Sequence, residues 1–282
     1  MYYAIVSAAV VMFGFQFYFN GRYEKKNGSG FASSMLFIFG GSLAGLAALL
    51  IINKFTLEVT PYTLIWSVVT ALNMMACLFC STKALTRINL SLYSIFSMLG
   101  GMVLPFVAGI AFYGEKITVG KALCFVAITA ALCLTFSKGE SKRGWIYYIG
   151  IFVFNGLSGV LSKAYQESTY EKASEASYSI LSAAVAVVIS GIILVAIRGK
   201  LKLPDKGSVL LMTGYGVFNK IANYLLLISL AHLPASTQYP MVTGGVMIVS
   251  TVLGCFTDKK PSKKELLSVA LSFIGIAALI VF

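Results

Sequence analysis

The sequence contains few charged residues for its length. Only 11% of the 282 residues are Asp, Glu, Lys or Arg, against about 25% in an ordinary soluble domain. A further 58% are hydrophobic. So few charges cannot cover the surface of a water-soluble fold of this size, because such a surface is built mainly from charged and polar side chains. We therefore exclude a soluble globular protein and expect lipid to contact most of the surface.

Cysteine and histidine are also scarce, which limits the possible chemistry. All five cysteines lie inside apolar runs, unlike a disulfide framework. Cys77 and Cys80 have the spacing of a redox motif, but on a membrane helix it places two small side chains on one face, so we interpret them as packing residues. His232 is the only histidine. We expect no metal, no cofactor and no enzymatic activity, because carboxylate pairs within the apolar runs and phosphate-binding glycine loops are also missing.

The few charges are strongly biased in sign, with 22 Lys and Arg against 10 Asp and Glu. In a soluble protein this excess would suggest nucleic acid. Here the basic residues fall in short loops between apolar runs. That distribution is typical of loops held on the cytoplasmic side and facing anionic lipid heads. We therefore expect the lipid bilayer and a small-molecule substrate as partners, and no nucleic acid.

Long apolar runs fill almost the whole chain. A membrane-crossing helix needs about 20 apolar residues, and ten runs approach or exceed that length. The first run lacks the basic start of a signal peptide, so we expect a membrane helix there. The sequence therefore predicts an all-α integral membrane protein with ten transmembrane helices. The runs are Tyr2–Asn20, Phe31–Ile52, Tyr62–Leu85, Leu90–Tyr113, Thr118–Phe136, Trp145–Lys163, Ala176–Ile197, Gly207–Leu230, Ala235–Phe256 and Glu265–Phe282.

The ten runs divide into two similar halves. Asn73 corresponds to Asn219 in the second half, and Gly100-Gly101 corresponds to Gly244-Gly245, with all such matches in the same order and 143–147 residues apart. We expect a first five-helix repeat over residues 1–137, a charged linker over 138–144 and a second repeat over 145–282. Five is an odd number, so the two repeats must be inverted relative to each other in the membrane. Inverted repeats are common in transporters.

The loops differ in charge according to the side on which they emerge. Loops after odd-numbered runs carry 16 Lys and Arg and loops after even-numbered runs carry 5, which with Lys220 makes the total of 22. The positive-inside rule then places the odd-numbered loops in the cytoplasm and both termini outside.

Two stretches resemble a known family. The first is Pro105 followed by Gly114-Glu115-Lys116, and the second is Ala231-His232-Leu233-Pro234-Ala235-Ser236 followed by Asp258-Lys259-Lys260. With them, nearly the whole chain resembles a ten-helix, EamA-type member of the drug/metabolite transporter (DMT) superfamily, although Asp258 departs from the usual Gly-Glu pair. The resemblance implies a cavity lined by helices one, three, four, six, eight and nine. It also implies termini inside the cell, opposite to the orientation that the charge bias favours.

Lys220 is the only residue carrying a formal charge near the middle of an apolar run. All ten acidic residues lie in loops or at helix ends. The first run has Gln16 where the small multidrug-resistance relatives have Glu, so exchange of a proton for a cationic drug is disfavoured. A charge within the membrane is costly and usually functional. We expect Lys220 to bind a carboxylate or phosphate of the substrate, or to take part in coupling as a neutral amine. The alternative is a structural lysine bonded to carbonyls or asparagines.

Other polar and aromatic residues within the runs are candidates for the same site. Amides within a membrane either line a cavity or bond one helix to another, and aromatic side chains either face the cargo or the lipid. Pro105 and Pro240 lie inside runs, where each favours a hinge or a kink. The candidate substrate-binding residues are Lys220, Asn219, Asn223, Asn73, Gln16, Asn155, Gln238, Tyr239 and Tyr93.

These observations lead to one main functional expectation. We expect a secondary transporter that moves a small organic metabolite across the cytoplasmic membrane by alternating access, as a monomer or homodimer. Lys220 favours an amino acid, a carboxylate or a phosphate-bearing compound. The alternative is a polytopic membrane enzyme or a lipid-handling protein that uses Lys220.

Overall fold

The computed structural model describes residues 1–28, 30–85, 90–134, 145–197, 203–255 and 262–281. Every regular element within these ranges is a helix, and each of the ten apolar runs coincides with one, which confirms the all-helical class there. The helices are α1 (Tyr2–Asn27), α2 (Phe31–Ile52), α3 (Pro61–Leu85), α4 (Leu90–Tyr113), α5 (Val119–Leu134), α6 (Trp145–Glu167), α7 (Glu175–Ala196), α8 (Lys206–Leu230), α9 (Ala235–Cys255) and α10 (Lys263–Val281).

Six helices within the described ranges are long and apolar enough to cross a membrane, namely α1, α2, α3, α4, α6 and α7. Large apolar side chains such as Ile65, Val126 and Ile192 are exposed on the outside of the bundle. An apolar surface of this extent is suited to lipid rather than water. Together these features indicate a membrane protein. α8, which Asn219, Lys220 and Asn223 interrupt, is not among these six helices.

α1 and α6 extend beyond the apolar runs that predicted them. We expected residues 21–28 to be a loop, but α1 continues to Asn27. The reason is tertiary packing: Tyr23 is buried, its ring centroid lies 4.4 Å from that of Phe37, and its hydroxyl donates to the Ser33 carbonyl over 3.2 Å. The helix ends at Gly28, whose φ of +77° is the left-handed conformation that glycine adopts readily.

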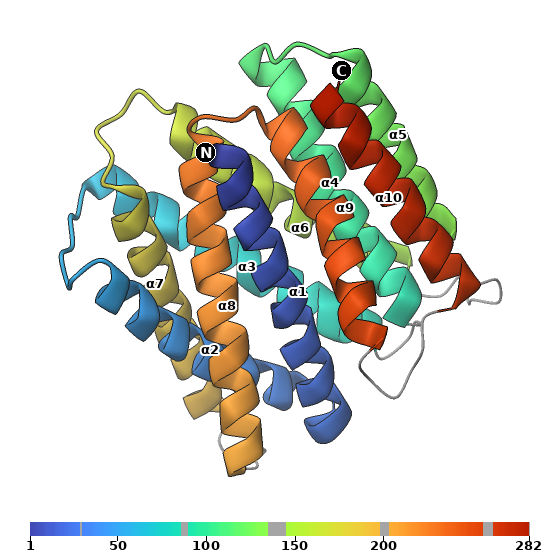
Figure 1. Ribbon diagram of the computed structural model, residues 1–282. Coiled ribbons are helices and arrows are strands. Elements are labelled where there is room, and N and C mark those ends of the chain that lie inside the picture. The colour runs from blue at the N-terminus through green and yellow to red at the C-terminus, as the bar shows by residue number, and fades with distance from the viewer. Residues whose placement is uncertain (29, 86–89, 135–144, 198–202, 256–261, 282) are drawn as a thin grey trace.

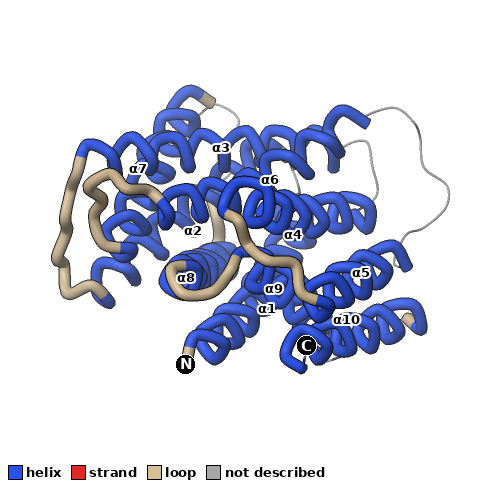
Figure 2. The backbone as a smooth tube through the Cα atoms, turned by 90° about the horizontal axis from the view of Figure 1, so that it is seen from above, coloured by secondary structure: helices blue, strands red, loops and turns tan. Residues whose placement is uncertain are grey.

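The helices form a bundle with two outer pairs and a central group. α2 packs against α7 at one edge, and α5 packs against α10 at the opposite edge (Figures 1 and 2). Between them, α1 packs on α8 and α9, while α6 packs on α3 and α4. The N-terminus and the end of α10 lie toward the same end of the bundle (Figure 1). We call this the terminal end, and the opposite end, where α1, α3, α5, α7 and α9 finish, the basic end.

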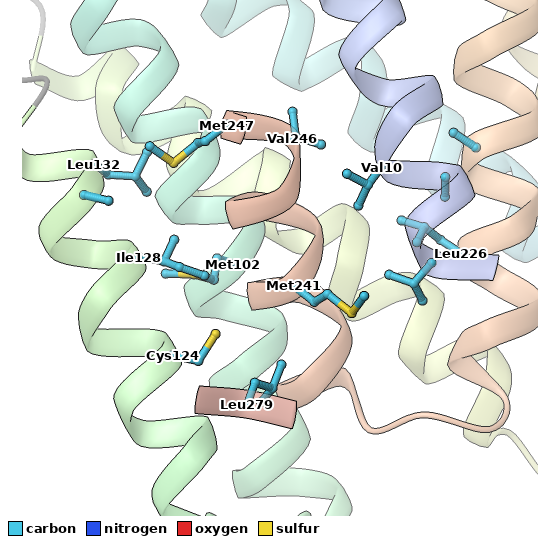
Figure 3. Packing of buried hydrophobic residues seen from close by; sticks show 14 residues of the cluster. Val10, Met102, Cys124, Ile128, Leu132, Leu226, Met241, Val246, Met247 and Leu279 are labelled. Atoms are coloured by element: carbon cyan, nitrogen blue, oxygen red, sulfur yellow. The ribbon is translucent and has the colours of Figure 1, made fainter. Parts of the chain in front are cut away.

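The largest hydrophobic core surrounds α9. Met241 and Met247 of α9 belong to one buried cluster with Met102 of α4, Ile128 of α5 and Val10 of α1 (Figure 3). This core joins the α5–α10 edge to the centre of the bundle.

Glycines allow three pairs of helices to approach closely, and in two of these pairs the glycine lies against the backbone of the other helix. A Cβ atom on Gly216 of α8 would overlap the Gly41 carbonyl of α2, and one on Gly100 of α4 would overlap the Phe152 carbonyl of α6. Gly245 of α9 lies against Val10, with only 2.8 Å available for a Cβ. Small residues at helix crossings allow this close approach. The α2–α8 crossing is important for the site, because it fixes α8 one turn before Lys220.

Candidate functional site

A cavity of about 460 Å³ lies in the middle of the bundle. Its volume falls within the range of small-molecule sites, roughly 300–1,000 Å³. Helices one, three, four, six, eight and nine all contribute to its lining, together with α2 and α7. At the basic end the lining includes the exposed Gly28, and toward the terminal end it includes the buried Tyr178 and Leu230.

Lys220 lies in this lining, near the middle of α8, and is half-buried. Its aliphatic stem packs against Gly45 of α2, where a Cβ atom would overlap the lysine side chain. Among the described residues, none accepts a hydrogen bond from the Lys220 amine or forms an ion pair with it. A buried charge without a partner is costly. The amine is therefore prepared to interact with an anionic group that enters the cavity.

Four of the predicted amides line the cavity. Asn219 donates to the Gln16 side-chain oxygen of α1 over 2.9 Å, and Asn223 donates to the Asn219 carbonyl over 2.8 Å. Asn155 also lines the cavity and donates to the Ser97 carbonyl over 2.6 Å. The amides from α1, α6 and α8 thus give the cavity a neutral polar wall.

Two predicted amides lie elsewhere, in contacts between helices. Asn73 is 6% exposed and donates to the Phe154 carbonyl over 2.9 Å and to the Ser158 hydroxyl over 2.8 Å, so it bonds α3 to α6. Gln238 is fully buried; it accepts from Ser229 over 2.7 Å and donates to a carbonyl of α8 over 3.0 Å. Both residues make the helix–helix bonds that were the alternative to a place in the cavity.

The aromatic candidates divide in the same way. Tyr239 lines the cavity and donates from its hydroxyl to the Gly159 carbonyl over 3.1 Å. Phe13 and Phe17 also belong to the lining. The side chain of Tyr93 is outside the described residues.

The sequence reasoning missed a group of hydroxyls that line the cavity: Ser158 and Ser162 on α6, Ser179 and Ser182 on α7, and Thr70 on α3. The Thr70 hydroxyl lies 2.7 Å from that of Tyr178, which also lines the cavity. The sequence did contain a signal for the serines. Ser158 and Ser162 are four residues apart and Ser179 and Ser182 are three apart, so each pair lies on one face of its helix.

Glu24 is another lining residue that the sequence reasoning did not select. It lies near the end of α1, toward the basic end, and is half-buried. Among the described residues, no Lys or Arg lies within ion-pair distance of its carboxylate. Lys220 and Glu24 are the charged residues of the described lining.

A buried ion pair lies beyond the cavity at the terminal end. Glu115 follows α4 in a loop, yet its side chain is only 7% exposed and that of Lys163 only 6%. The Lys163 amine lies 3.1 Å from Glu115 and 2.7 Å from Glu167. Glu115 also accepts the N–H groups of Ala235 and Ser236, over 2.7 and 2.8 Å, at the start of α9.

The neighbours of Glu115 keep it ionised. Burial by itself would raise the pKa of this carboxyl. The hydrogen bonds that it accepts from Ser236, Ala235 and Lys163 outweigh the effect of burial and hold the pKa below its usual value. The sequence placed Glu115 in a loop, and nothing local to the loop indicates these partners.

Two residues beside Lys163 extend the contacts at the terminal end. The hydroxyls of Tyr165 and Thr63 lie 3.1 Å apart, and Tyr165 donates to the Ala173 carbonyl over 2.8 Å. Gln166 donates to the Leu227 carbonyl of α8 over 2.8 Å. The last turn of α6 therefore contacts α3, α8 and the segment before α7.

Comparisons with known proteins show the fold alone. No family model matches the chain, and no curated protein matches significantly. Among solved structures, 28 chains match. One of them, described as "Crystal structure of protein", has a TM-score of 0.77 and 14% sequence identity, covering 98% of this chain and 98% of its own. The chain is therefore similar over its whole length to a fold that occurs in solved structures.

Proposed function

We propose that this protein is a secondary transporter that moves a small organic anion or zwitterion across the cytoplasmic membrane by alternating access. The observation that carries the proposal is the amine of Lys220, which has no described partner in a cavity of about 460 Å³ at the centre of a bundle of apolar helices. If Lys220 were needed only for packing, we would expect its charge to have a partner within the protein.

The helix contacts support two inverted repeats, over residues 1–137 and 145–282. Exchanging α1–α5 with α6–α10 converts the contacts of α1 with α8 and α9 into those of α6 with α3 and α4. The pairs α2–α7, α4–α9 and α5–α10 are converted into themselves. This is the contact pattern of two equivalent halves around one central axis, as in transporters that alternate between two shapes.

The two ends of the cavity differ, as one conformation of an alternating cycle requires. The lining reaches exposed Gly28 at the basic end. At the terminal end, the Glu115–Lys163 ion pair and the contact between the Tyr165 and Thr63 hydroxyls hold the helices together. The charge bias of the loops makes the basic end cytoplasmic. In that orientation the conformation is open to the cytoplasm.

The charges of the lining favour a carboxylate over a phosphate. One ammonium group, that of Lys220, balances one carboxylate. A phosphate ester carries about −1.5 to −2 charges at neutral pH, which would leave excess negative charge in a cavity that already contains Glu24. The amides and serines around Lys220 would bind the neutral polar groups of the same cargo.

Uptake into proteoliposomes tests the proposal. Radiolabelled monocarboxylates, zwitterionic amino acids and phosphate esters would be offered to wild type, to Lys220→Ala and to Lys206→Ala. Lys206 is the matched control, because it is an exposed lysine at the start of the same helix. We expect uptake of a carboxylate-bearing class that Lys220→Ala lowers at least about tenfold, which is the loss expected for one charged contact, and that Lys206→Ala leaves unchanged.

Two results would contradict this proposal. Uptake that Lys220→Ala does not change would remove the lysine from the site. No uptake of any class by folded wild type, together with chemical turnover of a membrane substrate, would favour the alternative of a membrane enzyme or lipid-handling protein.

A further inference from the structure

Glu115 is a residue of the first half of the chain that contacts two helices of the second half, α6 and α9. Its carboxylate lies over Gly109 of α4, where a Cβ atom would approach to 2.5 Å. From there it reaches Lys163 of α6 and the N–H groups of Ala235 and Ser236 at the start of α9. N–H groups at the start of a helix attract an anion, so each partner stabilises the same charge.

These contacts lie directly behind the cavity wall. Ser162, the neighbour of Lys163, lines the cavity, and so does Tyr239, one turn after Ala235. Opening the cavity at the terminal end requires α6 and α9 to separate from α4 there. Glu115 cannot remain bonded to both helices during that movement.

Lys163 has no charged counterpart in the first repeat, whereas Asp258, the residue that corresponds to Glu115, lies outside the described residues. The offset of 143–147 residues aligns Lys163 with positions 16–20, which read Gln-Phe-Tyr-Phe-Asn and carry no charge. The buried lysine is therefore a feature of the second repeat alone.

We propose that Glu115 is the latch of a gate at the terminal end, where the gate comprises Glu115, Lys163, Ala235 and Ser236. The inference rests on the proposed transport function. The latch closes when the carboxylate bonds α6 and α9 together, and the cavity opens toward the terminal end when those bonds break. Lys163 then keeps Glu167 as its partner, at 2.7 Å in the closed form, so the lysine is not left without an opposite charge.

Cysteine labelling tests the latch without any cargo. The five native cysteines would be replaced and Ser162→Cys introduced as the reporter on the cavity wall. A membrane-impermeant maleimide, added to whole cells or to inside-out vesicles, reaches one end of the protein in each case. In the otherwise unchanged protein we expect labelling from the basic end only. With Glu115→Gln, labelling from the terminal end should become at least about tenfold faster, because a buried charged contact is lost.

Glu171→Gln is the matched control. Glu171 is an exposed acid in the loop after α6, at the same end, and its neutralisation should leave labelling unchanged. A second protein, in which native Cys124 is the single cysteine, reports on folding, because Cys124 is fully buried and should stay unlabelled. If Glu115→Gln does not fold, Lys163→Gln carries the test, because Glu115 then keeps its bonds to α9.

Folded Glu115→Gln and Lys163→Gln proteins whose reporter is still labelled from the basic end alone would overturn the latch. The latch would also be overturned if the parent reporter protein, with Glu115 intact, were labelled from the terminal end as fast as the Glu115→Gln protein. Because labelling requires no cargo, the latch and the transport proposal fail separately: the first by labelling, the second by uptake.

Discussion

At the scale of single residues, a polar group inside this bundle is either satisfied by a neighbouring helix or left facing the cavity. Gln238 exemplifies the first case, since it is fully buried and bonded to Ser229 and to a carbonyl of α8. Lys220 exemplifies the second, because no described residue pairs with its amine. The two cases should respond differently to replacement by an apolar side chain of similar size.

We predict that Gln238→Leu destabilises the fold and Lys220→Met does not. Gln238→Leu removes two buried hydrogen bonds, to the Ser229 hydroxyl and to the Leu226 carbonyl, which together are worth about 1–3 kcal/mol. Lys220→Met removes an unpaired charge, so the stability should stay equal or rise while transport is lost, as is common at functional sites. Denaturant unfolding in detergent micelles measures the free energy of unfolding of each protein. A Lys220→Met protein less stable than Gln238→Leu would show that the lysine is structural.

The residue scale also shows how far the sequence identified the site. Six residues were selected as candidates because a polar or aromatic side chain within an apolar run can mark a binding site. All six line the cavity: Lys220, Asn219, Asn223, Gln16, Asn155 and Tyr239. Asn73 occupies the place in the first half that matches Asn219 in the second, but it bonds α3 to α6. Polarity alone could not separate the two, because in lipid both a cavity and a neighbouring helix can satisfy an amide.

At the scale of helices, the position of Lys220 depends on how closely α8 approaches α2. Gly216 touches the Gly41 carbonyl, and four residues later the stem of Lys220 fits against Gly45. Any side chain added at Gly216 must push α8 away from α2. The small residues of the two helices therefore set how closely α2 and α8 approach each other.

We predict that Gly216→Ala destabilises the protein and lowers transport together. The new methyl group overlaps backbone rather than a flexible side chain, and overpacking of this kind costs about 1–3 kcal/mol. Gly21→Ala is the matched control, because Gly21 lies within α1 and its new methyl group would meet no atom within 4 Å beyond the adjacent backbone of its own helix. That change should be neutral or stabilise by about 0.5–1 kcal/mol. Thermal unfolding and uptake of both variants check the prediction, and a Gly216→Ala protein as stable as Gly21→Ala would contradict it.

At the scale of the whole molecule, contacts between the halves close the terminal end at more than one place. The Glu58 backbone N–H donates to the Ser177 hydroxyl over 3.0 Å, and the Ser174 N–H donates to the Glu58 carboxylate over 3.1 Å. These bonds tie the segment before α3 to the start of α7. If the halves rock against each other, this distance must change during each cycle.

We predict that a short thiol cross-linker between Glu58→Cys and Ser177→Cys stops transport, because it holds two halves that must separate. The control is the pair Asn53→Cys and Thr56→Cys, which lies in the same inter-helix segment and wholly within the first half, where Asn53 donates to the Thr56 carbonyl over 2.6 Å. Cross-linking this pair should leave uptake unchanged. Uptake before and after treatment measures the effect, and full activity of the cross-linked 58–177 protein would argue against rocking of the halves.

The sequence by itself determined the apolar helices that indicate a membrane protein and the position of Lys220 inside one of them, because both follow from local composition and run length. Only the tertiary structure decided which polar side chains share the cavity and which bond to a neighbouring helix. It also buried Glu115, a loop residue by sequence, against Lys163 and the start of α9, which lie 48 and 120 residues further along the chain. The physical reason is that apolar side chains suit both lipid and the bundle interior, so hydrophobic periodicity does not reveal which face of a membrane helix points inward.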